Sequence, residues 1–234
     1  MSLTTVSVAG GPALRKRNRS VGSWLILTFG ILTAIVWVLF GRKVKQFVVT
    51  EAKSLAAVCE ARTDEIVPDD KNWTWVLERA CPDCGYESSI AVDQMGAAIR
   101  EQAALWAAVL ARPDVRLRPQ PTVWSPLEYG CHVRDVFKKF DERLGLMVNE
   151  DGPHFANWDQ DQTALDDRYW EQDPAAVAEQ LAAAAAGLAA RFDAVRPDQY
   201  QRQGFRSDGS AFTITTLAQY LLHDPVHHLW DVRA

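Results

Sequence analysis

The chain has 234 residues, of which 48% are hydrophobic and 24% are charged. This composition is that of a globular protein with room for one domain of ordinary size and an extension. The net charge is -5, and because nucleic-acid binding usually needs a basic face, we expect no nucleic-acid partner. Four irregularly spaced cysteines exclude a secreted disulfide scaffold.

The N-terminal 48 residues differ in kind from the rest. A basic stretch at 15–19 precedes an uncharged run from Ser20 to Gly41. As a helix, this run would be roughly 30 Å long, which matches the core of a bilayer. We therefore expect residues 21–41 to form a single transmembrane helix that anchors the chain to a membrane. A peripheral apolar helix, or an upstream stretch translated from a mis-set start codon, explains the same residues, and without insertion we expect a cytoplasmic protein.

Residues 49–71 have the polar, acidic character of a linker, and a globular domain is expected over 72–234. Its first helix is predicted over 91–111, where apolar residues follow helical spacing until Arg112-Pro113 ends it. The second begins at Ser125, with proline next and a glutamate at the third helical position, which together predict a capping box.

The other two helices are predicted from similar signals. Asp173-Pro174 begins the third, which runs through an alanine-rich stretch to Phe192, and a threonine cap near position 213 or 216 begins the fourth, which ends near Asp231. The piece from Gly204 to Thr213 would form at most a small hairpin. The predicted fold is therefore all-α, a four-helix bundle preceded by the apolar N-terminal helix.

Three of the five histidines lie in the last predicted helix. His223 and His227 are four residues apart, so their rings leave one helical face and are placed to bind one metal ion. His228 points about 100° away and is the weaker candidate. The pair alone also fits a polar patch at a helix end, and Pro225 between the two histidines predicts a kink.

A third histidine, His132, lies in the second helix beside its apolar stripe. Three imidazoles with an open coordination position describe a catalytic zinc or nickel site better than a structural one. Asp135 and Asp231 are expected either to accept hydrogen bonds from the ligand rings or to be solvated surface carboxylates. His154 and His228 are left outside this predicted site.

The segment from Trp124 to Asp135 resembles the W-S-x-x-E-x-x-x-H-[LV]-x-[DH] start of the second helix in the DinB superfamily, and His223-x-x-x-His227 resembles the final-helix motif of that family. The resemblance covers roughly residues 72–234 and is greatest to actinobacterial DinB-like proteins. It implies a four-helix bundle, often dimeric, with a divalent metal on His132, His223 and His227. It also implies a low-molecular-weight thiol such as mycothiol, because related members include mycothiol-dependent maleylpyruvate isomerase and bacillithiol transferases.

The sequence Cys81-Pro82-Asp83-Cys84-Gly85 resembles one half of a zinc ribbon knuckle. A structural zinc site needs four ligands, and the chain has no second CxxC. Zinc binding, a redox or disulfide pair, and a structural turn before the first helix all remain open for these two cysteines.

Two hypotheses about function follow. In the first, the protein is a metal-dependent, thiol-dependent transferase or a hydrolase, with Asp231 and Asp161 as acid or base groups and a small-molecule substrate. In the second, the metal only holds two helices together in a non-catalytic binding or sensor module. An open coordination position would support the enzyme, and a site closed by a fourth protein ligand would support the module.

Overall fold

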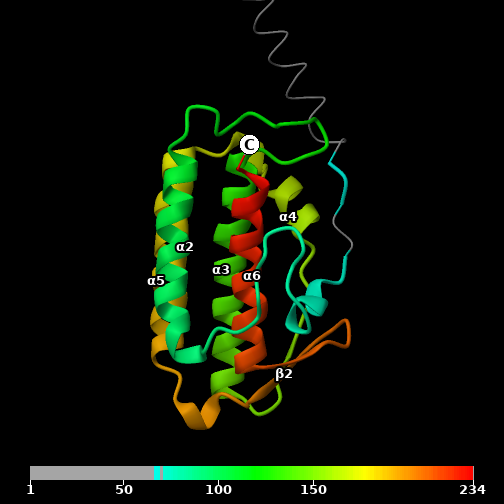
Figure 1. Ribbon diagram of the computed structural model, residues 1–234, viewed down its shortest axis with the longest axis vertical. Coiled ribbons are helices and arrows are strands. Elements are labelled where there is room, and N and C mark those ends of the chain that lie inside the picture. The colour runs from blue at the N-terminus through cyan, green and yellow to red at the C-terminus, as the bar shows by residue number, and fades with distance from the viewer. Residues whose placement is uncertain (1–65, 69–70, 234) are drawn as a thin grey trace, which may run out of the picture. The chain divides into compact units, whose positions relative to one another are not determined.

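Four long helices lie side by side in the computed structural model, which describes residues 66–68 and 71–233 (Figure 1). They are α2 (Met95–Leu110), α3 (Pro126–Asn149), α5 (Pro174–Asp193) and α6 (Ile214–Asp231). The predicted four-helix bundle is thereby confirmed. The predicted membrane helix and all but the end of the linker lie outside the described residues.

The helix ends follow the sequence signals closely. At the start of α3, the Ser125 side chain accepts a hydrogen bond from the backbone of Glu128, whose carboxylate in turn accepts from the Ser125 backbone N–H. Asp173 caps α5 and Thr213 caps α6 in the same way, each through a bond from a backbone N–H three residues later. These side chains satisfy N–H groups that a helix start would otherwise leave without partners.

The bundle is held together mainly by α5, which packs against both α2 and α3, while α6 packs against α3 and α2. The alanine-rich sequence of α5 permits this close approach. A glycine does the same on α3, because a Cβ at Gly130 would lie 2.7 Å from the Leu110 side chain of α2. Large buried side chains such as Trp106, Phe137 and Phe192 fill the centre.

Shorter elements surround the bundle. The hairpin expected near residue 204 is present as β2 (Gln203–Arg206) and β3 (Ala211–Thr213), and β2 also pairs in parallel with β1 (His154–Phe155), which the sequence did not predict. The connection from α3 to α5 contains a short helix, α4, that was not predicted. The described residues also form four 3-10 turns, of which only η3 lies in this connection. Their bounds are α4 Gln160–Asp166, η1 Trp73–Leu77, η2 Val92–Gln94, η3 Tyr169–Glu171 and η4 Pro197–Gln199.

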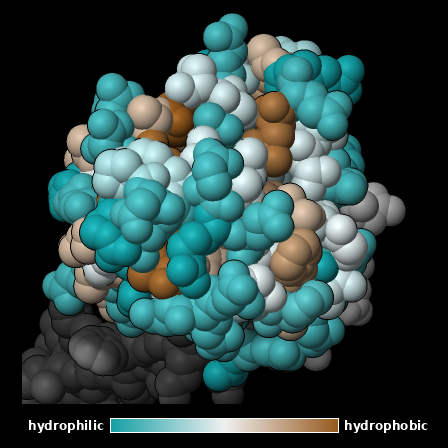
Figure 2. Space-filling model, turned by 90° about the horizontal axis from the view of Figure 1, so that it is seen from below, coloured by the Kyte–Doolittle hydropathy of each residue, from teal (hydrophilic) through white to brown (hydrophobic). Residues whose placement is uncertain are grey.

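The lower end of the bundle, seen in Figure 2, is mostly hydrophilic, and the described residues show hydrophobic colour there only in small separate spots. Exposed apolar residues of this kind are ordinary on a globular surface. None of the helices within 66–68 and 71–233 has both the length and the apolar character that crossing a membrane requires.

Candidate metal centres

Helix α6 presents its histidines in two adjacent rows. It runs without interruption from Ile214 to Asp231 with Pro225 inside it, and the Pro225 carbonyl accepts a hydrogen bond from the Trp106 indole at 3.2 Å. Because each residue turns a helix by about 100°, His223 and His227 share one face, while Asp224 and His228 share the next. The same four-residue spacing is therefore present twice, one residue apart.

The first row meets the two cysteines that precede the bundle. Cys81, Cys84, His223 and His227, which we call the Cys/His cluster, each place one ligand atom within 4.8 Å of the others. The Cys81 sulfur lies 3.6 Å from Nδ1 of His227. Burial, reinforced by the neighbouring Cys81, raises the pKa of the Cys84 thiol to about 11.

The turn that carries the cysteines is built by local backbone bonds and is attached to α6. The Gly85 N–H donates to the Cys81 carbonyl at 2.9 Å, with Gly85 at a positive φ of 74° that favours glycine. The hydroxyl of Tyr86 donates to the Gln219 carbonyl at 2.7 Å. Trp73 packs against both histidine rings, 5.3 Å from His223 and 4.9 Å from His227 between ring centroids.

The second row of α6 meets α3. His132, Asp224 and His228, which we call the His/Asp cluster, again place their ligand atoms within 4.8 Å of one another. Nε2 of His132 lies 3.3 Å from one Asp224 oxygen, and Nε2 of His228 lies 3.8 Å from the other. This set offers three protein donors where the Cys/His cluster offers four.

The rings of the His/Asp cluster are oriented by neighbours outside it. Asp231 accepts a hydrogen bond from Nδ1 of His228 at 2.7 Å, which turns the opposite nitrogen toward Asp224. The indole of Trp158 stacks on the His132 ring at 5.4 Å with an interplanar angle of 3°, and its N–H donates to Thr163 at 2.7 Å.

The structure thus divides the three predicted ligands between two places. Among the described residues, His132 gathers with Asp224 and His228, whereas His223 and His227 gather with the cysteines. His228, which the sequence analysis left out, belongs to the same cluster as His132. The spacing Asp224-x-x-x-His228 could have indicated this cluster, but His223-x-x-x-His227 has the same spacing one residue earlier and was chosen instead.

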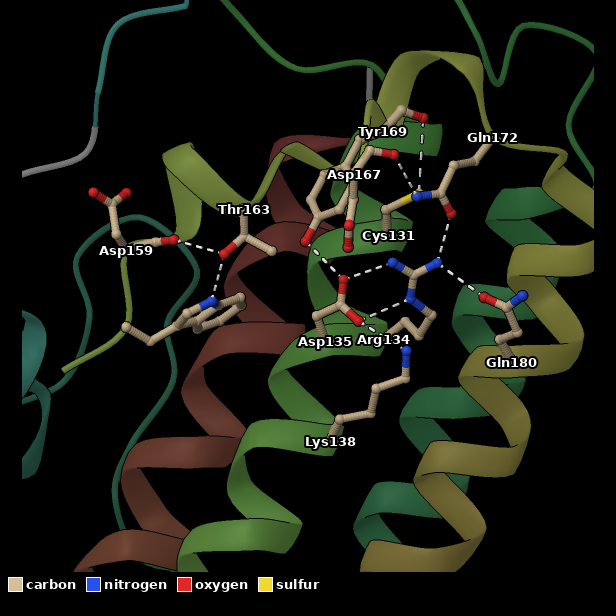
Figure 3. A network of polar contacts seen from close by, with 11 residues as sticks. Cys131, Arg134, Asp135, Lys138, Asp159, Thr163, Asp167, Tyr169, Gln172 and Gln180 are labelled. Atoms are coloured by element: carbon tan, nitrogen blue, oxygen red, sulfur yellow. Dashed lines mark hydrogen bonds and ion pairs between the residues drawn. The ribbon is translucent and has the colours of Figure 1, made fainter. Parts of the chain in front are cut away.

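Of the two carboxylates predicted to accept hydrogen bonds from the ligand rings, the structure places only one beside a histidine. Asp231 does accept from a ring N–H, that of His228, and lies 3.9 Å from His227. Asp135 does not serve His132, because it accepts hydrogen bonds from Arg134, Lys138 and Tyr169 (Figure 3). That network fixes α3 to the connection that leads into α5.

A cavity of about 570 Å³ opens beside both clusters, with Asp224 and His228 in its wall together with His223 and His227. Two buried arginines, Arg143 and Arg206, also line it. Burial and the charge of Arg206 lower the pKa of Arg143 to about 10, which still leaves it cationic at neutral pH. The predicted acid/base residue Asp161 and the stacked Trp158 lie in the same wall.

The donors in both clusters suit a divalent cation. Burial and the nearby His227 lower the pKa of His223 to about 4, so its ring is neutral at pH 7 and has a lone pair to donate. Asp224 is half-buried, and its desolvation raises its pKa, yet the charges of His132 and His228 hold that pKa below the usual carboxyl range. It is therefore an anionic ligand at neutral pH.

Several buried donor atoms have no hydrogen-bond partner, which a metal would explain. They include Nε2 of His223 and, in the His/Asp cluster, one oxygen of Asp224. Buried polar atoms are normally satisfied. Two nitrogen or oxygen ligands about 2.0–2.1 Å from a tetrahedral metal stand roughly 3.3–3.4 Å apart, and the His132–Asp224 distance of 3.3 Å agrees with that value. The residues of the His/Asp cluster therefore fit a bound metal.

Comparison with known proteins shows to which family this chain belongs. The family model of the DinB superfamily matches residues 97–232, which is more than half of the chain. No curated protein matches. A solved structure, YfiT from Bacillus subtilis, is similar with a TM-score of 0.55 and 16% identity over 62% of this chain and 88% of that one, and is described as a probable metal-dependent hydrolase with an unusual four-helix bundle topology. The match confirms the resemblance found in the sequence: the chain belongs to the DinB superfamily.

Proposed function

We propose that this protein is a metal-dependent hydrolase whose metal is held by His132, Asp224 and His228. The observation that carries the proposal is an open set of three donors, partly without hydrogen-bond partners, at the wall of a cavity of about 570 Å³. Two histidines and one carboxylate, with a remaining position for water or substrate, form a recurrent catalytic zinc set. The solved neighbour described as a probable metal-dependent hydrolase supports the same reading.

Zinc is the metal that this donor set favours, although two histidines and a carboxylate also bind Fe(II), and nickel remains the second expectation from the sequence. When bound, such a metal polarises a substrate carbonyl or lowers the pKa of its water ligand. The thiol-dependent S-transferase implied by the resemblance would use the same position for a thiol, so the proposed site serves either reaction.

The surrounding residues have separate tasks in this proposal. Asp231 fixes the tautomer and direction of the His228 ring by accepting its Nδ1–H. Arg143 lines one side of the cavity as a cation, which favours a substrate with an anionic group, whereas Arg206 is already paired with Asp208 at 2.8 Å. Asp161 lines the cavity and is the candidate general base for a proton on the attacking group.

A single metal on His132, His223 and His227 stays an alternative prediction. It would require these side chains to leave the positions in which they lie, because His132 is grouped with other donors. The two arrangements differ in one residue: Asp224 is a ligand in our proposal and a bystander in the alternative. Metal analysis of Asp224→Ala therefore separates them, with loss of one metal equivalent expected here and no loss in the alternative.

The function is tested with the full chain and a panel of esters, amides and thiol adducts that carry a carboxylate. We expect hydrolysis by the metal-loaded wild type, and a fall to the background rate in Asp224→Ala and His228→Ala. His154→Ala is the matched control, because this exposed histidine packs on Phe205, away from the cavity residues. Unchanged turnover in Asp224→Ala, or full turnover after the metal has been stripped by a chelator, would show that the proposed site is not catalytic. Transfer of a thiol in place of hydrolysis would assign the transferase reaction to this site.

A further inference from the structure

We propose that the Cys/His cluster is a second, structural zinc site, with Cys81 and Cys84 as two ligands and His223 and His227 as the other two. This inference is independent of the proposed hydrolase, since it concerns other residues and a different task. The donor set is that of a Cys2His2 zinc site, with C-x2-C spacing on one side and H-x3-H spacing on the other. The two histidines could not be assigned to the cysteines from spacing, because 138 residues, 85–222, separate the two halves of the site.

The distances fit a tetrahedral ion. A sulfur about 2.3 Å and a nitrogen about 2.0–2.1 Å from a tetrahedral zinc stand about 3.5–3.6 Å apart. The Cys81 sulfur and Nδ1 of His227 are 3.6 Å apart, and all four ligand atoms lie within 4.8 Å of one another. A thiol hydrogen bond accounts for the first distance alone, but not for the convergence of four donors.

The surroundings of His223 add an independent observation. Its Nε2 is buried and has no hydrogen-bond partner, and the whole residue is only 4% exposed. Leaving such a buried atom unsatisfied is unfavourable. Because a neutral imidazole nitrogen can donate its lone pair to a metal, a cation shared with the nearby sulfurs gives this atom its missing partner.

The position of the cluster indicates a structural role. Four protein ligands complete the tetrahedron of a zinc ion and leave no position for substrate, in contrast to the three donors of the His/Asp cluster. The ion would join the segment before α2 to α6. Within the described residues, that segment also contacts α6 through the packing of η1 and through hydrogen bonds. Among these bonds, the Tyr86 hydroxyl donates to the Gln219 carbonyl, and the Gln219 side-chain amide donates to the Ile90 carbonyl.

Elemental analysis and cobalt substitution test the site in the full chain. We expect two metal equivalents in the wild type and one each in Cys84→Ser and His132→Ala. After replacement of zinc by Co(II), sulfur-to-cobalt charge-transfer absorption should persist in His132→Ala and disappear in Cys84→Ser. Cys131→Ala is the matched control, because this buried thiol lies in the core, close to the Tyr169 carbonyl at 3.9 Å; it should keep both the absorption and the metal.

Two measurements keep the proposal testable if a cysteine variant folds poorly. X-ray absorption of zinc-loaded His132→Ala should show two sulfur and two nitrogen neighbours, and hydrogen exchange should become faster across residues 73–90 of the wild type when a chelator removes the metal. A disulfide between Cys81 and Cys84 in the protein as isolated, a zinc shell without sulfur, or full metal content in Cys84→Ser would each overturn the structural site. None of these results would affect a metal on Asp224, so the two proposals fail separately.

Discussion

Replacing Asp231 tests how the His/Asp cluster is oriented. Its carboxylate accepts the Nδ1–H of His228 at 2.7 Å, a short distance for a bond to a charged acceptor. Loss of such an outer acceptor typically costs 10–100-fold in metal affinity, or about 1.4–2.7 kcal/mol. The side chains of Asp231 and His228 are 19% and 16% exposed, so water screens part of the interaction.

The two obvious variants should therefore differ. Asp231→Asn keeps an oxygen that can still accept from the ring and removes only the charge, so we expect a loss of zinc affinity near the lower end, about 10-fold. Asp231→Ala removes the acceptor altogether and should approach about 100-fold. The orientation of His228, rather than the shape of the site, is what these variants change.

Competition with a chromophoric chelator, monitored for each site in Co(II)-loaded and Zn(II)-loaded protein, gives the affinities. The Cys/His cluster is the internal control, because Asp231 lies 3.9 Å from Nε2 of His227, beyond hydrogen-bond distance. Asp198→Asn is a matched substitution at an exposed carboxylate that pairs with Arg196. Wild-type affinity in Asp231→Ala, or an equal loss at both clusters, would refute the assignment of Asp231 to His228.

Three further predictions concern the scaffold. Gly204→Ala should destabilise the protein by about 1–3 kcal/mol in urea unfolding, because the new Cβ would lie 2.7–2.9 Å from atoms of Met147 and Phe155; a change below the error of the measurement would contradict this packing. Burial raises the pKa of Asp135, but the hydrogen bonds that its carboxylate accepts from cationic and hydroxyl donors lower it more, so the pKa lies below the usual carboxyl range. The ionised carboxylate therefore stabilises the fold at any pH above its pKa in the unfolded chain, and this stabilisation is lost as the pH falls through its pKa in the folded protein. We expect Asp135→Asn to be less stable than the wild type at neutral pH and to lose less stability in acid, as measured by unfolding from pH 7 to pH 2. Ser125→Ala removes a buried cap of α3 and should cost about 0.5–2 kcal/mol, whereas equal stability in thermal and urea unfolding would show that the cap is dispensable.

The fold was predictable because its determinants are local. Three of the four helices, α3, α5 and α6, begin at a side-chain cap, which proline follows in α3 and α5, and these signals act within three or four residues of the chain. The parallel pairing of β1 with β2 was not predictable in the same way. It joins His154 to Phe205 through a register that only the packed bundle determines, and a two-residue strand has no periodicity to detect.

The candidate sites show where local reasoning stops. Spacing correctly separates His228 from His223 and His227, since the structure places them on adjacent faces of α6. Spacing does not tell which face meets α3 and which meets the cysteines. That choice depends on the rotation of α6 about its own axis, which long-range packing sets.

This dependence gives the two clusters a mechanical relation. Their members on α6 are consecutive in sequence, Asp224 after His223 and His228 after His227, so a rotation of the helix by one residue would carry one row to the place of the other and turn the other row away. An ion held by four ligands at the Cys/His cluster would resist such a rotation, because it joins α6 to a segment outside the helix. The closed site would thereby keep Asp224 and His228 directed toward His132. In this view the cysteines support the open site without touching it, and the protein combines the structural and the catalytic arrangements that the sequence analysis treated as alternatives.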